Sequence, residues 1–210
     1  TEIDVNQVSA QRITPLLIAT QNGFVEVVRS LLQYGIADVN EPDDEGKPPL
    51  YIASYNGHIE MLRVLLECKD IDVNKSDKKG VTPLWIAAYS NQAEVLQILL
   101  SQPNIDVNKK DKKYGKTAIE IVVSRFQNRL FKSQLRIATL LLTHPNIQVP
   151  EHVKEAVVQM SETMSYKKKV TAKNKKKTKK NAKTIKNKKK KNKKKRKKNA
   201  KTKRKKEKEQ

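Results

Sequence analysis

The amino-acid sequence predicts an all-α solenoid of stacked, paired helices with hairpin loops, followed by a disordered basic tail. One observation behind this is a unit of about 34 residues that recurs along residues 14–149. Another is the charge distribution: residues 167–210 hold 27 of the 45 basic and two of the 22 acidic residues. The tail therefore carries a net charge of +25 and the preceding 166 residues one of −2, so the two parts need separate interpretations.

Two short markers define the repeat. The first is Thr-Pro-Leu-Leu-Ile-Ala at 14–19, and related segments begin at 48, at 82 and, in a weaker form, at 117. The second marker, Asp-Val-Asn, begins at residues 4, 38, 72 and 106, always 34 residues apart. This spacing predicts four repeats at about 14–46, 47–80, 81–115 and 116–149.

Each repeat begins with the signals of a short first helix. Thr14 and Thr82 are N-cap residues, and proline follows at the first helical position, where a missing N–H costs nothing. Gly23 and Gly57 are placed to end this helix in the left-handed conformation, and Asn91 takes the same place in the third repeat.

A second helix is predicted in each repeat from apolar residues at i, i+3 and i+4, which form one buried stripe. These stripes are Val27, Val28, Leu31 and Leu32; Met61, Leu62, Leu65 and Leu66; and Val95, Leu96, Leu99 and Leu100. The segments 41–46 and 75–80 are too polar for a core, and we interpret them as exposed hairpin loops.

Taken together, these segments resemble the ankyrin repeat over about residues 3–149. The resemblance rests on the repeated openings, Asn-Gly-His-Ile-Glu at 56–60, the paired leucines and the Asp-Val-Asn endings. It implies a scaffold that binds another protein through its concave face and hairpin tips. The histidine that often follows Thr-Pro-Leu in the family is replaced by Leu17, Tyr51, Trp85 and Glu120. The family's hydrogen bonds at this position are therefore not expected here.

Both ends of the array depart from the regular pattern. The fourth repeat contains about seven extra residues near 125–132, which would fit a longer helix or a protruding loop. Residues 150–166 predict a C-terminal capping helix, because a terminal repeat needs a polar outer face. Residues 1–13 are expected to be the end of a preceding, truncated repeat.

No catalytic, cofactor-binding or metal-ligating residues are predicted, so we expect a protein that is not an enzyme. The three histidines, His58, His144 and His152, and the lone Cys68 have no zinc spacing. His58 is expected to have a local structural role. Asp72-x-Asn74-x-Ser76 resembles the start of a calcium loop but lacks its glycine and closing glutamate. No apolar run reaches the roughly 18 residues of a membrane span, so no membrane insertion is expected.

The candidate protein-binding residues are aromatic residues of the first helices and charged residues of the hairpin tips. They are Tyr51, Tyr55, Trp85, Tyr89, Asp43, Asp44, Lys78 and Lys79. Tyrosine and tryptophan are enriched at binding hot spots. For Tyr51 and Trp85 the alternative is packing between repeats, whereas exposure is favoured for Tyr55 and Tyr89. The alternative for the charged tips is ordinary solvation.

The tail predicts a second functional element. Its densest cluster is Lys188, Lys189, Lys190, Lys191, Lys193, Lys194, Lys195, Arg196, Lys197 and Lys198. Such runs are typical of nuclear or nucleolar targeting through an import receptor, and of non-specific binding to RNA or DNA. Residues 167–210 contain no aromatic residue, which argues against base stacking. Attraction to anionic lipid and simple solubilisation are the alternatives.

We therefore expect an intracellular adaptor, with the nucleus or nucleolus favoured over the cytoplasm. In one alternative, the tail binds nucleic acid and the repeats only support it. In another, the chain is a C-terminal fragment of a larger multidomain protein.

Overall fold

The structure is a computed structural model that describes residues 13–35, 37–125, 131–159 and 161–162. The chain divides into two units, residues 1–161 and 162–210, and the fold below is that of the first. The predicted disordered tail at 167–210, the lysine cluster at 188–198 and nearly all of the expected preceding repeat at 1–13 lie outside the described residues.

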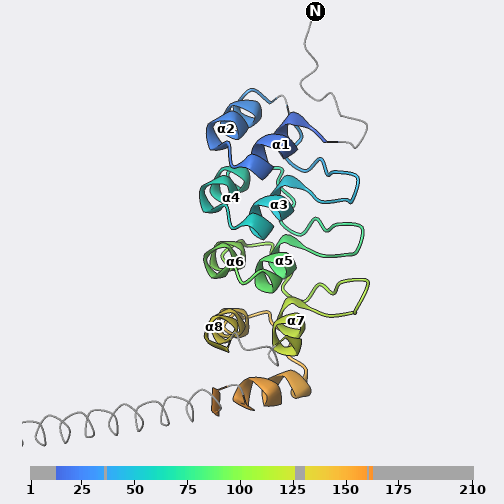
Figure 1. Ribbon diagram of the computed structural model, residues 1–210, viewed down its shortest axis with the longest axis vertical. Helices are drawn as coiled ribbons and strands as arrows, with labels where there is room; N and C mark the ends of the chain where they lie inside the picture. Colours follow the sequence, from blue (N-terminus) through green and yellow to red (C-terminus); the bar gives the residue numbers. More distant parts are fainter. Residues whose placement is uncertain (1–12, 36, 126–130, 160, 163–210) are drawn as a thin grey trace, which may run out of the picture. The chain divides into compact units, whose positions relative to one another are not determined.

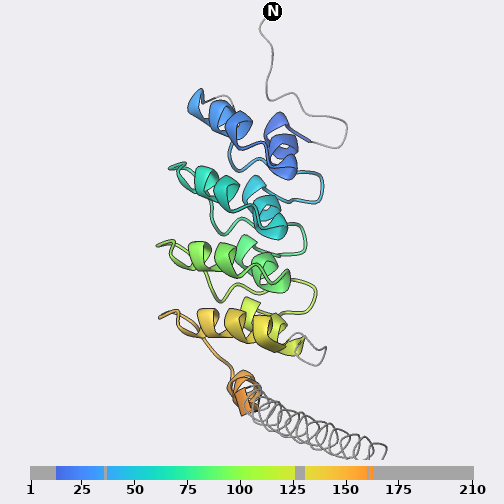
Figure 2. The same ribbon diagram turned by 60° about the vertical axis from the view of Figure 1, so that its left-hand side comes forward.

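Four pairs of helices stack one above another, and a loop on the same side connects each of the first three pairs to the next (Figures 1 and 2). The pairs are α1 (Pro15–Asn22) with α2 (Val25–Gln33), α3 (Pro49–Asn56) with α4 (Ile59–Leu66), α5 (Pro83–Tyr89) with α6 (Ala93–Leu100), and α7 (Ala118–Ser124) with α8 (Phe131–Leu142). The described residues contain no β-strand. The predicted all-α solenoid of paired helices and hairpin loops is confirmed.

The first helices begin as the sequence predicts. The hydroxyls of Thr14 and Thr82 accept the N–H three residues later at 3.2 and 3.1 Å. Thr117 adds a complete capping box with Glu120 at the start of α7. Proline in the first turn of α1, α3 and α5 has no N–H, so each of these helices begins with one fewer donor that lacks a helical partner.

The same helices end in the predicted left-handed residues. Gly23 and Gly57 have φ angles of 74° and 73°, and Asn91 has a φ of 60°. The residue after Gly57 then links two repeats, because Nδ1 of His58 lies 3.2 Å from the carbonyl oxygen of Thr20. His58 therefore has the structural role that the sequence indicates.

One apolar core runs through all four layers. Leu62, Leu65, Leu96 and Leu99 are fully buried at the predicted stripe positions of α4 and α6. Burying one such side chain contributes roughly 1.5–3 kcal/mol, so the stripes supply much of the stabilisation between layers.

Three asparagines connect successive layers at the base of each hairpin. In each, the side-chain N–H donates to a carbonyl oxygen of the next repeat, and the side-chain oxygen accepts an N–H two residues further on. These asparagine clamps are Asn40 with Asp70 and Asp72 (2.7 and 2.9 Å), Asn74 with Asn104 and Asp106 (2.6 and 2.8 Å), and Asn108 with Asn146 and Gln148 (both 2.8 Å). The asparagines of the second, third and fourth Asp-Val-Asn markers therefore each bond to the following repeat.

The fourth repeat is longer in its second helix. Helix α8 has 12 residues, against eight in α4 and in α6, so part of the extra sequence near 125–132 extends this helix. Residues 126–130 lie outside the described part. A further helix covers 151–159, and its Val153 is buried in the common core. In the part of the chain that the structure describes, no helix is long and apolar enough to cross a membrane.

Candidate protein-binding surface

The four candidate aromatic residues divide into two buried and two exposed side chains. Tyr51 and Trp85 are 8% and 5% exposed, whereas Tyr55 and Tyr89 are 54% and 40% exposed. Tyr51 and Trp85 therefore pack between repeats, which is the alternative that the sequence left open for them. Tyr55 and Tyr89 present the aromatic surface that a partner can reach.

Trp85 connects its own repeat to the next. Its indole Nε1 donates to the carbonyl oxygen of Lys116 at 3.0 Å, and its ring belongs to a small apolar cluster with Tyr51 and Ile121. Burial likewise raises the pKa of the Tyr51 phenol. Trp85 occupies the position where the family often has histidine, and it supplies a hydrogen-bond donor between repeats. The sequence did not predict this hydrogen bond.

Tyr89 contacts two flat groups. Its ring stacks on Trp85 with centroids 5.3 Å apart, and the guanidinium of Arg125 lies 4.0 Å from its ring centroid. Arg125 also donates to the backbone carbonyl of Tyr89. Such cation–π contacts fix the ring orientation. Nothing in the sequence pairs Arg125 with Tyr89, because the two are 36 residues apart and Arg125 falls at the irregular fourth repeat.

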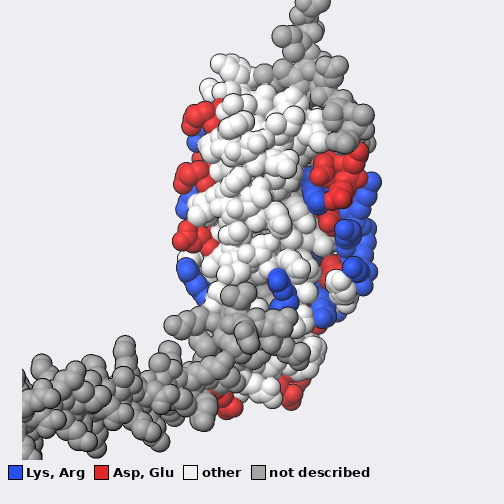
Figure 3. Space-filling model, in the orientation of Figure 1, with Lys and Arg blue, Asp and Glu red and all other residues white. Residues whose placement is uncertain are grey.

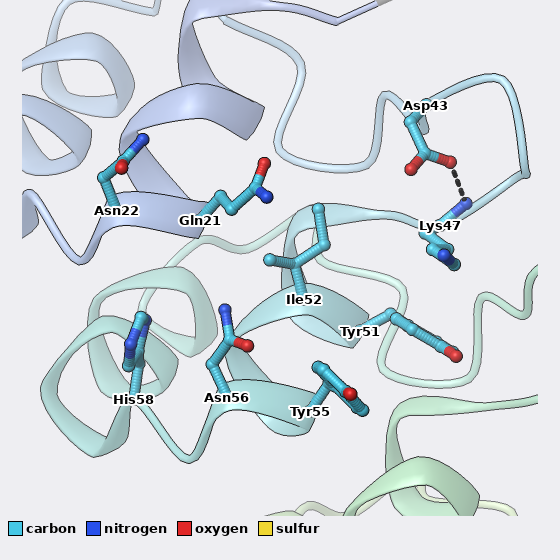
Figure 4. Close-up of a pocket in the computed structure, with 9 residues that line it drawn as sticks. All are labelled: Gln21, Asn22, Asp43, Lys47, Tyr51, Ile52, Tyr55, Asn56 and His58. Atoms are coloured by element: carbon cyan, nitrogen blue, oxygen red, sulfur yellow. Dashed lines mark hydrogen bonds between the residues drawn. The ribbon is translucent and has the colours of Figure 1, made fainter.

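Two hollows lie along the first helices, and we call them together the inner groove. The first, of about 740 Å³, lies between α1, α3 and the hairpin loop at 43–47, and Figure 4 shows the residues that line it. The second, of about 250 Å³, reaches from α3 to α7. Tyr55 lines both hollows, and Tyr89 and Arg125 line the second.

The inner groove is lined mainly by neutral polar groups and aromatic rings. Its side-chain amides come from Gln21, Asn22, Asn56, Asn91 and Gln134. Figure 3 agrees, because a largely uncharged band separates the charges over the second helices from those over the hairpins. Amides that donate and accept, beside exposed tyrosines, are suited to contact polypeptide backbone and apolar side chains.

The charged candidates of the hairpin tips have different roles. The Asp43 carboxylate accepts the backbone N–H groups of Glu45 and Lys47 at 2.9 and 2.8 Å, so it stabilises the turn. Asp44, Lys78 and Lys79 are exposed. Asp77 and Asp111 repeat the arrangement of Asp43 in the next two hairpins.

Glu120 also stands at the place of the family histidine, and it too has a structural partner. Burial alone would raise the pKa of Glu120, but hydrogen bonds from the backbone N–H and hydroxyl of Thr117, at 2.8 and 2.9 Å, lower it below its ordinary value. His152 of the following helix lies 4.0 Å from the same carboxylate.

The described residues contain no group of three His, Cys, Asp or Glu side chains that could hold a metal ion. Cys68 is a half-buried free thiol whose pKa is raised by burial and by the nearby Glu67 and Asp70. A raised pKa leaves little thiolate at neutral pH, so this cysteine has no sign of activation.

Comparisons with known proteins agree with this architecture. A family model described as three copies of the ankyrin repeat matches residues 1–77, and one described as many copies of the ankyrin repeat matches residues 65–122. A search of curated proteins finds no match. Ankyrin repeats are generally protein-interaction modules. The repeat spacing, the stacked helix pairs and both family models place this chain in the ankyrin-repeat family.

Proposed function

We propose that this protein is a non-enzymatic adaptor that binds another protein through its inner groove and hairpin tips. The observation that carries the proposal is Tyr55, an exposed aromatic side chain that lines both hollows of the groove. Tyr89 supports it, because its ring is already fixed by Trp85 and Arg125 and loses little freedom when a partner covers it.

The expected contribution of these tyrosines is large. A buried aromatic side chain removes about 150–250 Å² from water, and truncation of an aromatic hot spot costs on the order of 2 kcal/mol or more. Loss of Tyr55 should therefore weaken partner binding at least thirtyfold, since 1.4 kcal/mol corresponds to about tenfold.

The test compares Tyr55→Ala with Tyr34→Ala in the full chain. Tyr34 is 75% exposed and follows α2, outside the inner groove, so it controls for the loss of an exposed tyrosine. Proteins cross-linked to the wild type in cells should be lost with Tyr55→Ala and retained with Tyr34→Ala. Equal recovery with both variants would count against the inner groove as the binding surface.

The second part of the proposal concerns the tail, which directs the protein to the nucleus or nucleolus or holds it on RNA or DNA. Support comes from the 27 basic residues of 167–210 and the absence of aromatic residues there. Fluorescent fusions with and without 167–210 test targeting, and identical distributions would refute it. A filter-binding titration against salt tests the alternative, because tail deletion should then abolish RNA binding and leave protein capture intact.

A further inference from the structure

We infer that the hairpin loops bind a polypeptide segment that is basic at one end and acidic at the other. This rests on the proposed binding function and adds the charge order of the partner. The first hairpin, residues 41–47, has a net charge of −3, the second, 75–81, one of +2, and the third, 109–116, one of +4. Figure 3 shows this change from acidic to basic along one edge of the molecule.

The three hairpins form one continuous row. The N–H of Lys78 donates to the carbonyl oxygen of Glu45 at 3.0 Å, and the N–H of Lys112 donates to that of Lys79 at 2.7 Å. Gly46 permits this approach, because a Cβ atom there would lie 2.8 Å from the backbone nitrogen of Lys78. The order of the charges is thus fixed by the backbone before any partner binds.

The basic side chains of this row are accessible to solvent, although Nζ of Lys112 also donates to the carbonyl oxygen of Lys78 at 3.4 Å. Lys78, Lys79, Lys110, Lys112 and Lys113 are all exposed. None of the five forms an ion pair with another described residue. The aspartates of the same two hairpins are buried and accept backbone N–H groups, so they do not compete for a partner's charges.

At the acidic end of the row, neighbouring lysines interact with the carboxylate of Glu45. Glu45 pairs with Lys47, and the pKa of its carboxyl is lowered by that hydrogen bond and charge, with smaller contributions from Lys79 and Lys78. Asp44 beside it is exposed. The first hairpin therefore presents the side chains of Asp44 and Glu45 at the acidic end of the row.

This charge order favours a polypeptide over a nucleic acid. A phosphate backbone is negative along its whole length, so a strand lying on the two basic hairpins would meet repulsion at the first. A polypeptide can change sign within a few residues. Helix layers pack about 8–10 Å apart, so three hairpins span roughly 20 Å, which about six extended residues cover.

The experiment uses the full chain and net-neutral peptides of about twelve residues. Two block peptides carry an acidic and a basic half in either order, and a third has the same residues in alternation. The basic tail attracts the acidic half of both block peptides, so the preference is also compared between variants that all keep the tail. At low salt we expect the better block peptide to bind about tenfold more tightly than the alternating one, and the preference to shrink as salt rises.

Charge reversal locates that preference. Lys78→Glu with Lys79→Glu changes the net charge of the second hairpin from +2 to −2 and should reduce the preference. Arg63→Glu with Lys69→Glu, an equal charge change at exposed sites of α4 and the turn after it, should leave the preference intact. No preference in the wild type, or an equal preference in the Lys78/Lys79 variant and the control, would overturn the inference. A single-stranded RNA probe adds a further arm. If RNA affinity falls more in the Lys78/Lys79 variant than in the control, the row binds phosphates and the inference is also overturned.

These outcomes are separate from the test of the proposed function. If the Tyr55→Ala variant loses its cellular partners while no block preference exists, only the charge order is refuted. If the preference exists but Tyr55→Ala retains every partner, the hairpin row binds and the inner groove does not.

Discussion

Replacing Asn74 by alanine should weaken the contact between the second and third repeats. Its side chain makes two hydrogen bonds across that contact, to the carbonyl oxygen of Asn104 at 2.6 Å and from the N–H of Asp106 at 2.8 Å. Alanine at this position removes both bonds, and the helix pairs keep all their apolar contacts. The change therefore isolates the contribution of one asparagine clamp.

The magnitude follows from the exposure of the bonded groups. A net contribution of about 0.5–1.5 kcal/mol per hydrogen bond gives about 1–3 kcal/mol for the pair. Because both bonds lie in a solvent-exposed setting, water replaces part of the loss, and we expect about 1–2 kcal/mol. For a folded unit of this size that corresponds to a fall in Tm of roughly 2–8 °C.

Thermal and urea unfolding of the full chain, followed by circular dichroism, measures this loss. Asn104→Ala is the matched control, because Asn104 contributes its backbone carbonyl to the clamp and its own side chain is exposed. The control should stay within about 0.5 kcal/mol of the wild type. Equal stabilities of the Asn74 and Asn104 variants would refute the reasoning that the clamp stabilises the stack.

Four further predictions concern other contacts. Gly80→Ala should lower the free energy of unfolding by about 2 kcal/mol or more, because its φ is +78° and a Cβ would lie 2.9–3.0 Å from the next hairpin. Gly35→Ala, where the Cβ would meet open space, should lower it by about 1 kcal/mol, and urea unfolding compares the two variants. Trp85→Phe should lose about 1–2 kcal/mol in the same assay, since it leaves a carbonyl oxygen of the next repeat without its indole donor; unchanged stability would contradict this. The folded-state pKa of Glu120 is lowered, so its ionised form stabilises the fold above the ordinary value of 4.5 and this contribution disappears as pH falls through the folded pKa. The stability of the wild type should then fall more steeply below about pH 4.5 than that of Glu120→Gln, and parallel pH profiles would argue against the capping role. Cys68 in the native protein should react with iodoacetamide at pH 8 more slowly than in urea, and equal rates would contradict its raised pKa.

The repeat and its helix ends could be predicted because they depend on local chemistry. A threonine that caps a helix and a glycine or asparagine that ends it act within a few residues of themselves. Gly23, Gly57 and Asn91 accordingly adopt the expected conformation. The bonds of the asparagine clamps join residues 30 or more apart, so the sequence showed their recurrence and not their partners.

The candidate surface was harder to predict, for a geometric reason. Trp85 and Tyr89 are four residues apart on one helix, so they lie on the same stripe and periodicity cannot separate buried from exposed. The hairpin that follows makes the difference between the two residues. Its backbone accepts a hydrogen bond from the indole N–H of Trp85, which is buried, whereas Tyr89 remains partly exposed. The contact of Arg125 with Tyr89 likewise depends on where the irregular fourth repeat places its chain.

From the hydrogen bonds between them, we expect the hairpins to give the stack a preferred direction of bending. Each of the first two hairpins of the row bonds to the next one at its base, through Asn40 or Asn74, and again near its tip, through Lys78 or Lys112. Two bonds separated along a loop resist twisting, whereas apolar side chains between helices can slide by small amounts. Thermal bending should therefore pivot about the hairpin edge, with the largest excursions at α2, α4, α6 and α8. The inner groove lies close to that pivot and should keep its width while the outer helices move.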